Sequence, residues 1–177
     1  MAGFSIRRLG PEDAAAYREI RLEGLERHPE AFGSTYETEA GLSLEDFARR
    51  VVEVPTFAAE RDGRLLGLAG LARETSTKRR HRGTLIRMYV RPEARGSGVA
   101  DALVTAVLDH ARAEGLDAVL LAVITEAEPA RRLYDRHGFT VYGVEPGTPR
   151  LRGCGCAARR RRTGRRRAAP RVPPHRR

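Results

Sequence analysis

A short turn rich in glycine carries the residues of this sequence that are best suited to chemistry. It lies between a strand-like and a helix-like run, and its sequence is Arg95-Gly96-Ser97-Gly98-Val99-Ala100. The two glycines allow a tight turn and let a ligand approach the backbone without meeting a Cβ atom. The free amides of the helix's first turn, backed by the positive end of its dipole, favour a phosphate or pyrophosphate. Arg95 adds a fixed positive charge with several hydrogen-bond donors.

Several interpretations of this turn compete. A plain strand–helix turn also needs such glycines. A Rossmann dinucleotide site fits poorly, because the third glycine of G-x-G-x-x-G would fall at Asp101, an acid at the phosphate edge. A Walker loop is excluded because no Gly-Lys-Ser/Thr is present. A plain turn and another kind of pyrophosphate loop stay open at this point.

The elements around the turn predict a mixed sheet with helices packed on it. Periodicity, caps and turn residues give, in chain order, strand 4–9, helix 11–27, loop 30–41, helix 43–52, hairpin 56–74, strand 84–90, helix 96–115, strand 117–124, helix 129–137 and strand 139–144. Antiparallel strands come first and a parallel βαβ crossover follows at 85–124. The predicted fold class is therefore α/β, with a mostly antiparallel sheet and one parallel pair.

Two motifs resemble those of the GNAT superfamily of N-acetyltransferases. Arg95-x-x-Gly98-x-Ala100 after a strand resembles that family's Q/R-x-x-G-x-G/A loop for the pyrophosphate of acetyl-CoA. The segment PARRLYDRHGF at 129–139 resembles its A-x-x-L-Y-x-x-x-G-F helix and strand. Both occur in the family's order and spacing. The chain is therefore identified as a member, which implies an acyl-CoA N-acyltransferase fold, acetyl-CoA as co-substrate and direct attack by a primary amine.

The resemblance also implies the cofactor contacts. The strand before the loop would splay from its parallel neighbour and pair with the pantetheine arm through the backbone of Met88, Tyr89 and Val90. This is β-augmentation by a cofactor, so side-chain identity matters little there. The pyrophosphate would be held by Arg95 and by the backbone amides of Gly96, Ser97, Gly98, Val99 and Ala100.

Tyr134 matches the family's tyrosine that protonates the departing CoA thiolate. A phenol with a pKa near 10 can give a proton to a thiolate and recover it from solvent. The alternative is a core aromatic on an amphipathic helix. Ala127 stands where the family often has an asparagine that contacts cofactor or polar backbone.

The acceptor amine and the general base are not identified by the sequence. Many relatives carry a carboxylate near 84–87, where this chain has Thr-Leu-Ile-Arg. Glu37 and Glu39 lie in a segment that lines the acceptor side in the family, where each either acts through water or is a solvated loop acid. Phe32 and Tyr36 are expected to shape the acceptor site. Polyamines, amino acids, aminoglycoside-like compounds and protein N-termini stay open as acceptors.

The strongly basic composition comes from the end of the chain. The net charge is +10, but all 23 acids lie at or before Glu145. Residues 1–149 hold 21 of the basic residues and carry a net charge of −2. We therefore expect an acetyltransferase domain at 1–146 and a disordered Arg/Pro/Gly-rich tail at 147–177, which binds polyanions only incidentally.

The tail stands where the family has one more apolar strand, inserted between strands 117–124 and 139–144. Nothing after Gly147 is apolar enough to predict it, so the final strand is expected to be missing. Our hypothesis is that the reading frame is lost near 146–150. A shifted frame of the coding DNA should then encode an apolar strand at this point, and the hypothesis fails if none does.

The cysteine content and the lack of long apolar stretches bear on metal binding and on membrane association. Cys154, Cys156 and His175 are too few to form a structural zinc site, so no metal is expected. No apolar stretch of 18 residues and no signal-like start are present, which predicts a soluble cytoplasmic protein without membrane contact, monomeric or homodimeric. The rival functions are a CoA-binding protein without catalysis and a nucleic-acid binder that uses the tail.

Overall fold

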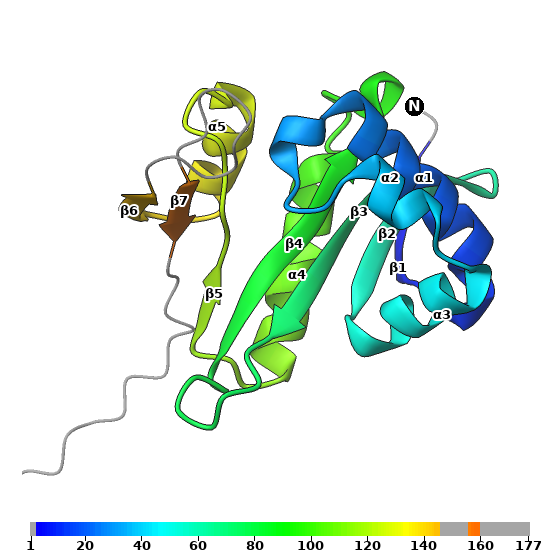
Figure 1. Cartoon of the computed structure of the whole chain (residues 1–177). Helices are drawn as coiled ribbons and strands as arrows, with labels where there is room; N and C mark the ends of the chain where they lie inside the picture. Colours follow the sequence, from blue (N-terminus) through cyan, green and yellow to red (C-terminus); the bar gives the residue numbers. More distant parts are fainter. Residues whose placement is uncertain (1–2, 146–155, 160–177) are drawn as a thin grey trace, which may run out of the picture.

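The computed structural model describes residues 3–145 and 156–159, which include a central sheet with helices packed on it (Figure 1). The elements, in chain order, are β1 Ser5–Arg8, η1 Pro11–Asp13, α1 Ala14–Arg27, η2 Pro29–Ala31, α2 Tyr36–Ala40, α3 Leu44–Glu53, β2 Thr56–Arg61, β3 Arg64–Arg73, β4 Arg82–Val90, η3 Pro92–Ala94, α4 Val99–Ala113, β5 Ala118–Leu120, α5 Glu128–Arg136, β6 Val141–Glu145 and β7 Cys156–Arg159.

The main sheet has the strand order β1-β2-β3-β4-β5. The first three pairings are antiparallel, and β4 pairs with β5 in parallel. The predicted mixed α/β class, mostly antiparallel with one parallel pair, is confirmed. Asp62 and Gly63, with φ of 51° and 74°, form the turn between β2 and β3 that the sequence predicts.

The sheet separates two hydrophobic cores. On one face, α4 buries Val99, Leu103 and Val107, each 0% exposed, against a cluster that includes Leu71 and Leu85. On the other face, α1 and α3 bury a smaller cluster that includes Tyr17, Phe47 and Leu68. The helices therefore form two separate layers, and side chains that alternate along β4 reach different layers.

Local signals explain where several helices begin. The Ser43 hydroxyl accepts from the Asp46 amide at 3.1 Å, while the Ser43 amide donates to the Asp46 carboxylate at 3.0 Å. This capping box starts α3 as the sequence predicts. Pro11 opens η1, which leads into α1, and Gly98 is the N-cap of α4.

Two predicted elements differ from the structure. The segment 30–41, expected to be a loop, contains the end of η2 and all of α2. The strand expected over 117–124 is limited to Ala118–Leu120. This strand ends early because β4 diverges from it, so residues after Leu120 have no neighbouring strand of the main sheet to pair with.

The expectation that no strand follows Gly147 is wrong at Cys156–Arg159. These residues form β7, which pairs antiparallel with β6 and lies beside β5. This is the position that the family resemblance assigns to the last strand. Its sequence, Cys-Ala-Ala-Arg, has no β-branched or aromatic residue, which is why composition did not indicate it. Residues 146–155 and 160–177, on which the predicted disorder and frame loss depend, lie outside the described residues.

A buried ion cluster joins α1, α2 and α3. Glu39, 2% exposed, accepts from Arg21 Nε and Nη2 at 3.0 and 2.8 Å, and Arg50 Nη1 lies 3.2 Å from the same carboxylate. Burial alone would raise the pKa of Glu39, but the hydrogen bond and charge of Arg21, with Ser34 and Arg50, outweigh it and lower that pKa. Glu39 is therefore a paired structural carboxylate, not a solvated loop acid.

Glu39→Gln is expected to lower the free energy of unfolding at pH 7 by about 3–5 kcal/mol, because two guanidiniums lose their buried counter-ion. The folded-state pKa lies below the unfolded value, so the carboxylate's contribution is present above that unfolded value and is lost as pH falls through the folded pKa. Urea unfolding from pH 7 downward should therefore show the two proteins converging. Glu37→Gln, exposed on the same helix, is the control and should change stability by under about 0.5 kcal/mol. Equal losses in both variants would contradict the prediction.

Candidate functional site

The parallel pair of strands opens along its length. Pairing between β4 and β5 covers Arg82↔Ala118 to Thr84↔Leu120, where β5 ends, while β4 continues to Val90. Figure 1 shows the two strands diverging from this point. The β4 edge that faces β5 over Met88, Tyr89 and Val90 is unpaired within the described residues. These are the residues predicted to pair with the pantetheine arm of the cofactor.

A bulge in β4 precedes this open edge. Leu68 pairs with Tyr89 and Gly70 with Ile86, so two residues of β4 stand opposite a single residue of β3. Arg87, one of the two, has φ of 60°, a left-handed conformation that is rare outside glycine. Bulges of this kind redirect side chains and recur near active sites.

The glycine-rich turn has the backbone geometry that an anion site needs. Gly96 and Gly98 have φ of 75° and 86°, and a Cβ at either position would meet no atom within 4 Å. The Ser97 hydroxyl donates to Ala94 O at 2.6 Å and fixes the turn. The first helical hydrogen bond runs from Ala102 N to Gly98 O, so the amides before it precede the hydrogen-bond ladder of α4. Open space and free amides at a helix start suit a pyrophosphate.

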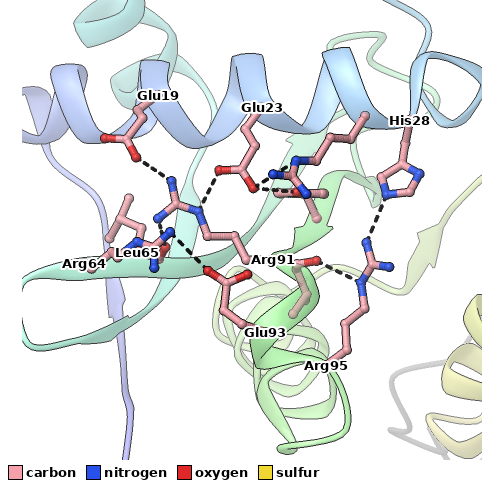
Figure 2. Close-up of polar contacts among 11 residues, drawn as sticks. Glu19, Glu23, His28, Arg64, Leu65, Arg91, Glu93 and Arg95 are labelled. Carbon is pink, nitrogen blue, oxygen red and sulfur yellow. Dashed lines mark hydrogen bonds and ion pairs between the residues drawn. The ribbon is translucent and has the colours of Figure 1, made fainter.

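Arg95 lies beside this turn but contacts α1. Its Nε donates to Val90 O at 3.2 Å, and its Nη2 lies 2.9 Å from His28 Nε2 (Figure 2). The side chain therefore joins the end of β4 to the end of α1. Its predicted contact with a pyrophosphate stays a prediction.

Asp101, the acid that argued against a Rossmann site, is paired with basic side chains of another element. Its carboxylate accepts from Arg136 Nη2 at 3.0 Å, and His137 Nε2 lies 3.2 Å from it. These partners belong to the C-terminal end of α5. The negative charge is thereby paired, and α4 is joined to the segment that carries Tyr134.

A buried arginine fixes the open strand against α1, and sequence reasoning did not single it out. Arg91 is 2% exposed and donates to Glu23 at 2.8 Å, to Glu19 at 2.5 Å and to Leu65 O at 2.9 Å (Figure 2). Tyr89 donates its hydroxyl to Glu23 at 2.9 Å, and burial, then Glu23, raise its pKa to about 12. The sequence hints at this network only through the i, i+4 spacing of Glu19 and Glu23, which places both carboxylates on one face of α1.

Tyr134 lies in the last turn of α5, and its side chain is almost completely buried. Its ring contacts Phe139 edge-on with centroids 5.7 Å apart, within the hydrophobic cluster against which Met88 packs. Burial raises the pKa of Tyr134 to about 12. The phenol is therefore protonated at neutral pH. Ala127 is the N-cap of α5 and makes no side-chain cap hydrogen bond, which the family's asparagine could supply.

The other residues expected on the acceptor side divide into two groups. Phe32 is partly buried, with Arg21 Cζ 4.8 Å from its ring centroid, and Glu39 belongs to the buried ion cluster. Tyr36 and Glu37 are exposed on α2. A carboxylate whose pKa is lowered is a weak base, so the structure gives Glu39 no advantage as the general base.

An open strand edge beside a helix start with free amides is the arrangement of a protein that binds an acyl-phosphopantetheine such as acetyl-CoA. Known proteins agree with this class. A model described as the Acetyltransferase (GNAT) family matches residues 18–139. The chain therefore belongs to that family, whose members use acetyl-CoA as co-substrate.

Curated relatives include two bacterial mycothiol acetyltransferases. Those of Thermomonospora curvata and Streptomyces bingchenggensis are 34% and 31% identical to this chain over 149 and 150 residues. Each match covers 81% of this chain but 46% and 45% of the relative, so the chain spans about half the length of the curated relatives it matches.

Solved structures share the fold. An acetyltransferase of the GNAT family from Streptococcus pneumoniae has a TM-score of 0.80 at 20% identity, covering 92% of this chain and 100% of that chain. The yncA protein of Salmonella typhimurium, solved with its cofactor acetyl-CoA, has a TM-score of 0.76 at 22% identity, covering 96% and 99%. A CoA-binding protein without catalysis and a nucleic-acid binder are not favoured by these relatives.

No helix within residues 3–145 and 156–159 is long and apolar enough to cross a membrane. In the same residues, no group of three or more His, Cys, Asp or Glu is arranged to hold a metal ion.

Gly98→Ala is expected to lower the free energy of unfolding by about 1–2 kcal/mol, because an alanine must adopt the left-handed conformation there. It should also weaken acetyl-CoA binding by shifting the amides of the first turn of α4. Urea unfolding and calorimetric titration with acetyl-CoA measure the two effects. Gly33→Ala is the control, since its Cβ meets open space and its φ is ordinary. Unchanged acetyl-CoA affinity in Gly98→Ala would contradict the predicted pyrophosphate site.

Proposed function

We propose that this chain transfers the acetyl group of acetyl-CoA to a primary amine by direct attack. The observation that carries the proposal is the unpaired β4 edge over Met88, Tyr89 and Val90, which lies next to the amides at the start of α4. The edge offers backbone donors and acceptors to a pantetheine arm. The helix start offers its amides and dipole to a pyrophosphate at one end of that arm.

The pyrophosphate contacts in this proposal come from the turn itself. Positive φ at Gly96 and Gly98 orients the backbone, and the open space at both positions leaves room for a ligand. The proposed amide donors are those of Gly96, Ser97, Gly98, Val99 and Ala100. Arg95, held beside them by Val90 O and His28, would supply the positive charge.

In the proposed reaction a neutral amine attacks the thioester carbonyl carbon. The new C–N bond forms, the C–S bond breaks and CoA leaves as a thiolate, while the amine loses its extra proton to water. Tyr134 is the proposed donor to the thiolate. Its pKa of about 12 keeps it protonated, and a phenol this weakly acidic acts by donating a hydrogen bond as charge develops on sulfur. No side chain is assigned as the base.

The proposal also covers the acceptor amine, the cellular location and the part of the chain that carries catalysis. The name of the relatives, mycothiol acetyltransferase, adds the substrate of those enzymes to the acceptors to be tested. The absence of cysteine before Cys154 supports a cytoplasmic location, since no disulfide framework is possible there. We assign catalysis to residues 1–146, alone or as a homodimer, and incidental polyanion binding to the arginine-rich segment from 147.

A thiol-release assay with acetyl-CoA and a panel of amines tests the activity. The panel holds polyamines, amino acids, aminoglycosides, N-terminal peptides and the substrate of the mycothiol acetyltransferases. Calorimetric titration with acetyl-CoA, run in parallel, separates binding from turnover. Amine-dependent thiol release is the expected result, and tight binding without release on any amine would contradict the proposal.

Tyr134→Phe is expected to lower kcat by about 10²-fold or more, with the acetyl-CoA dissociation constant unchanged, because it removes only the hydrogen-bond donor to the leaving sulfur. Folding should be preserved, since the ring keeps its packing against Phe139. Tyr142→Phe removes an exposed hydroxyl on β6 and serves as the control with wild-type kcat. A Tyr134→Phe variant with full kcat would remove the assignment.

A further inference from the structure

Arg87 is placed between the predicted cofactor strand and the layer formed by α1 and α3. Its guanidinium carbon lies 5.7 Å from the centroid of the Tyr17 ring, and its Nη1 donates to Arg50 O at 3.3 Å. The next residue, Met88, packs against the opposite core, beneath α4. The bulge therefore sends the Arg87 side chain away from the α4 layer while keeping it adjacent to the open edge of β4.

The charge around Arg87 is unbalanced. The charged groups that act on one another here are three guanidiniums, those of Arg21, Arg50 and Arg87, and one carboxylate, that of Glu39. Glu39 is already bound by Arg21 and Arg50, and no carboxylate forms an ion pair with Arg87 in the described part of the chain. Burial is the main cause that lowers the pKa of Arg87, and the two neighbouring arginines add to it.

A second polar group in the same cluster lacks a partner. The hydroxyl of Tyr17, a side chain that is 0% exposed, makes no hydrogen bond within the described residues. The charged groups that act on it are Arg87, Arg21, Glu39 and Arg50. A buried hydroxyl without a partner costs free energy, as does a desolvated guanidinium without a counter-ion.

A purely structural role explains Arg87 poorly. Its bond to Arg50 O is long at 3.3 Å, and that carbonyl already accepts from the Val54 amide at 3.2 Å. The left-handed φ of Arg87, a non-glycine residue, is strained, and such strain is concentrated at functional sites. An anionic group of a ligand would satisfy the guanidinium, and it would arrive beside the strand edge where the acetyl group is expected.

We infer that Arg87 binds a carboxylate of the acceptor, so that the acceptor is an amino acid or another small primary amine that carries a carboxylate. The inference rests on the proposed acetyl transfer and names its substrate class. Arg87 would form charge-assisted hydrogen bonds to the carboxylate. Binding through the carboxylate would hold the amine beside the β4 edge.

The test compares amine pairs that differ only in the carboxylate. Each common L-amino acid that has a primary α-amine and no side-chain carboxylate is assayed with acetyl-CoA beside its own α-carboxamide. The carboxamide's amine is the less basic of the two and has the larger neutral fraction near pH 8. A preference for the acid form therefore cannot come from amine ionisation. We expect kcat/KM to favour the acid over the amide by at least about 10-fold for the best pair.

Arg87→Gln should lower kcat/KM for the acid by about 10- to 100-fold and leave the amide unchanged, which also shows that the variant is folded. Arg87→Lys should retain part of the preference, because the charge remains without the forked donors. Arg82→Gln makes the same change at the paired end of the same strand and should keep the wild-type ratio.

The outcomes separate the inference from the proposed function. Equal use of acid and amide by the wild type, or an unchanged ratio in Arg87→Gln, overturns the inference and leaves acetyl transfer standing. If no amine is acetylated, the proposed function fails, and calorimetric titration of the same pairs in saturating CoA then decides the inference. Binding of the acid that is lost in Arg87→Gln supports it, whereas equal or no binding of the two forms overturns it.

Discussion

The loss of hydrogen bonds between β4 and β5 is the constraint on which the rest of the structure depends. β4 keeps its pairing with β3 up to Val90, whereas β5 stops at Leu120 and leaves the far edge of β4 open. An unpaired strand edge is normally a liability in a protein. Here it lies next to the start of α4, so one extended ligand can use both the strand's backbone groups and the helix's amides.

Holding such an edge in place requires support from the opposite side of the strand. Arg91 supplies it, with its guanidinium shared between Glu19 and Glu23 of α1 (Figure 2). Tyr89 adds a hydrogen bond to the same Glu23. β4 is thus anchored to α1, the helix that also carries Tyr17 and Arg21. In the proposed reaction, the two substrates would reach β4 from different layers of the fold and meet there.

Features determined by short stretches of chain were predictable from the sequence. The start of α3 at Ser43, the hairpin of β2 and β3 with its turn at Gly63, and the helix after the glycine-rich turn all appear as expected. Each depends on residues a few positions apart, whose backbone preferences and periodicity act whatever the rest of the chain does. The two spaced motifs then sufficed for the family, and with it the fold class and co-substrate.

The sequence by itself therefore determined the layered sheet, the glycine-rich turn and the family. Only the tertiary structure decided which charges are paired, because those partners are far apart in the chain. Glu39 is a buried counter-ion and not a loop acid, and Asp101 is neutralised by Arg136. A bulge whose register is set by β3 directs Arg87 toward α1, and β7 pairs with β6 despite its weak strand propensity. Burial and long-range pairing fix these features, and neither can be inferred from neighbouring residues alone.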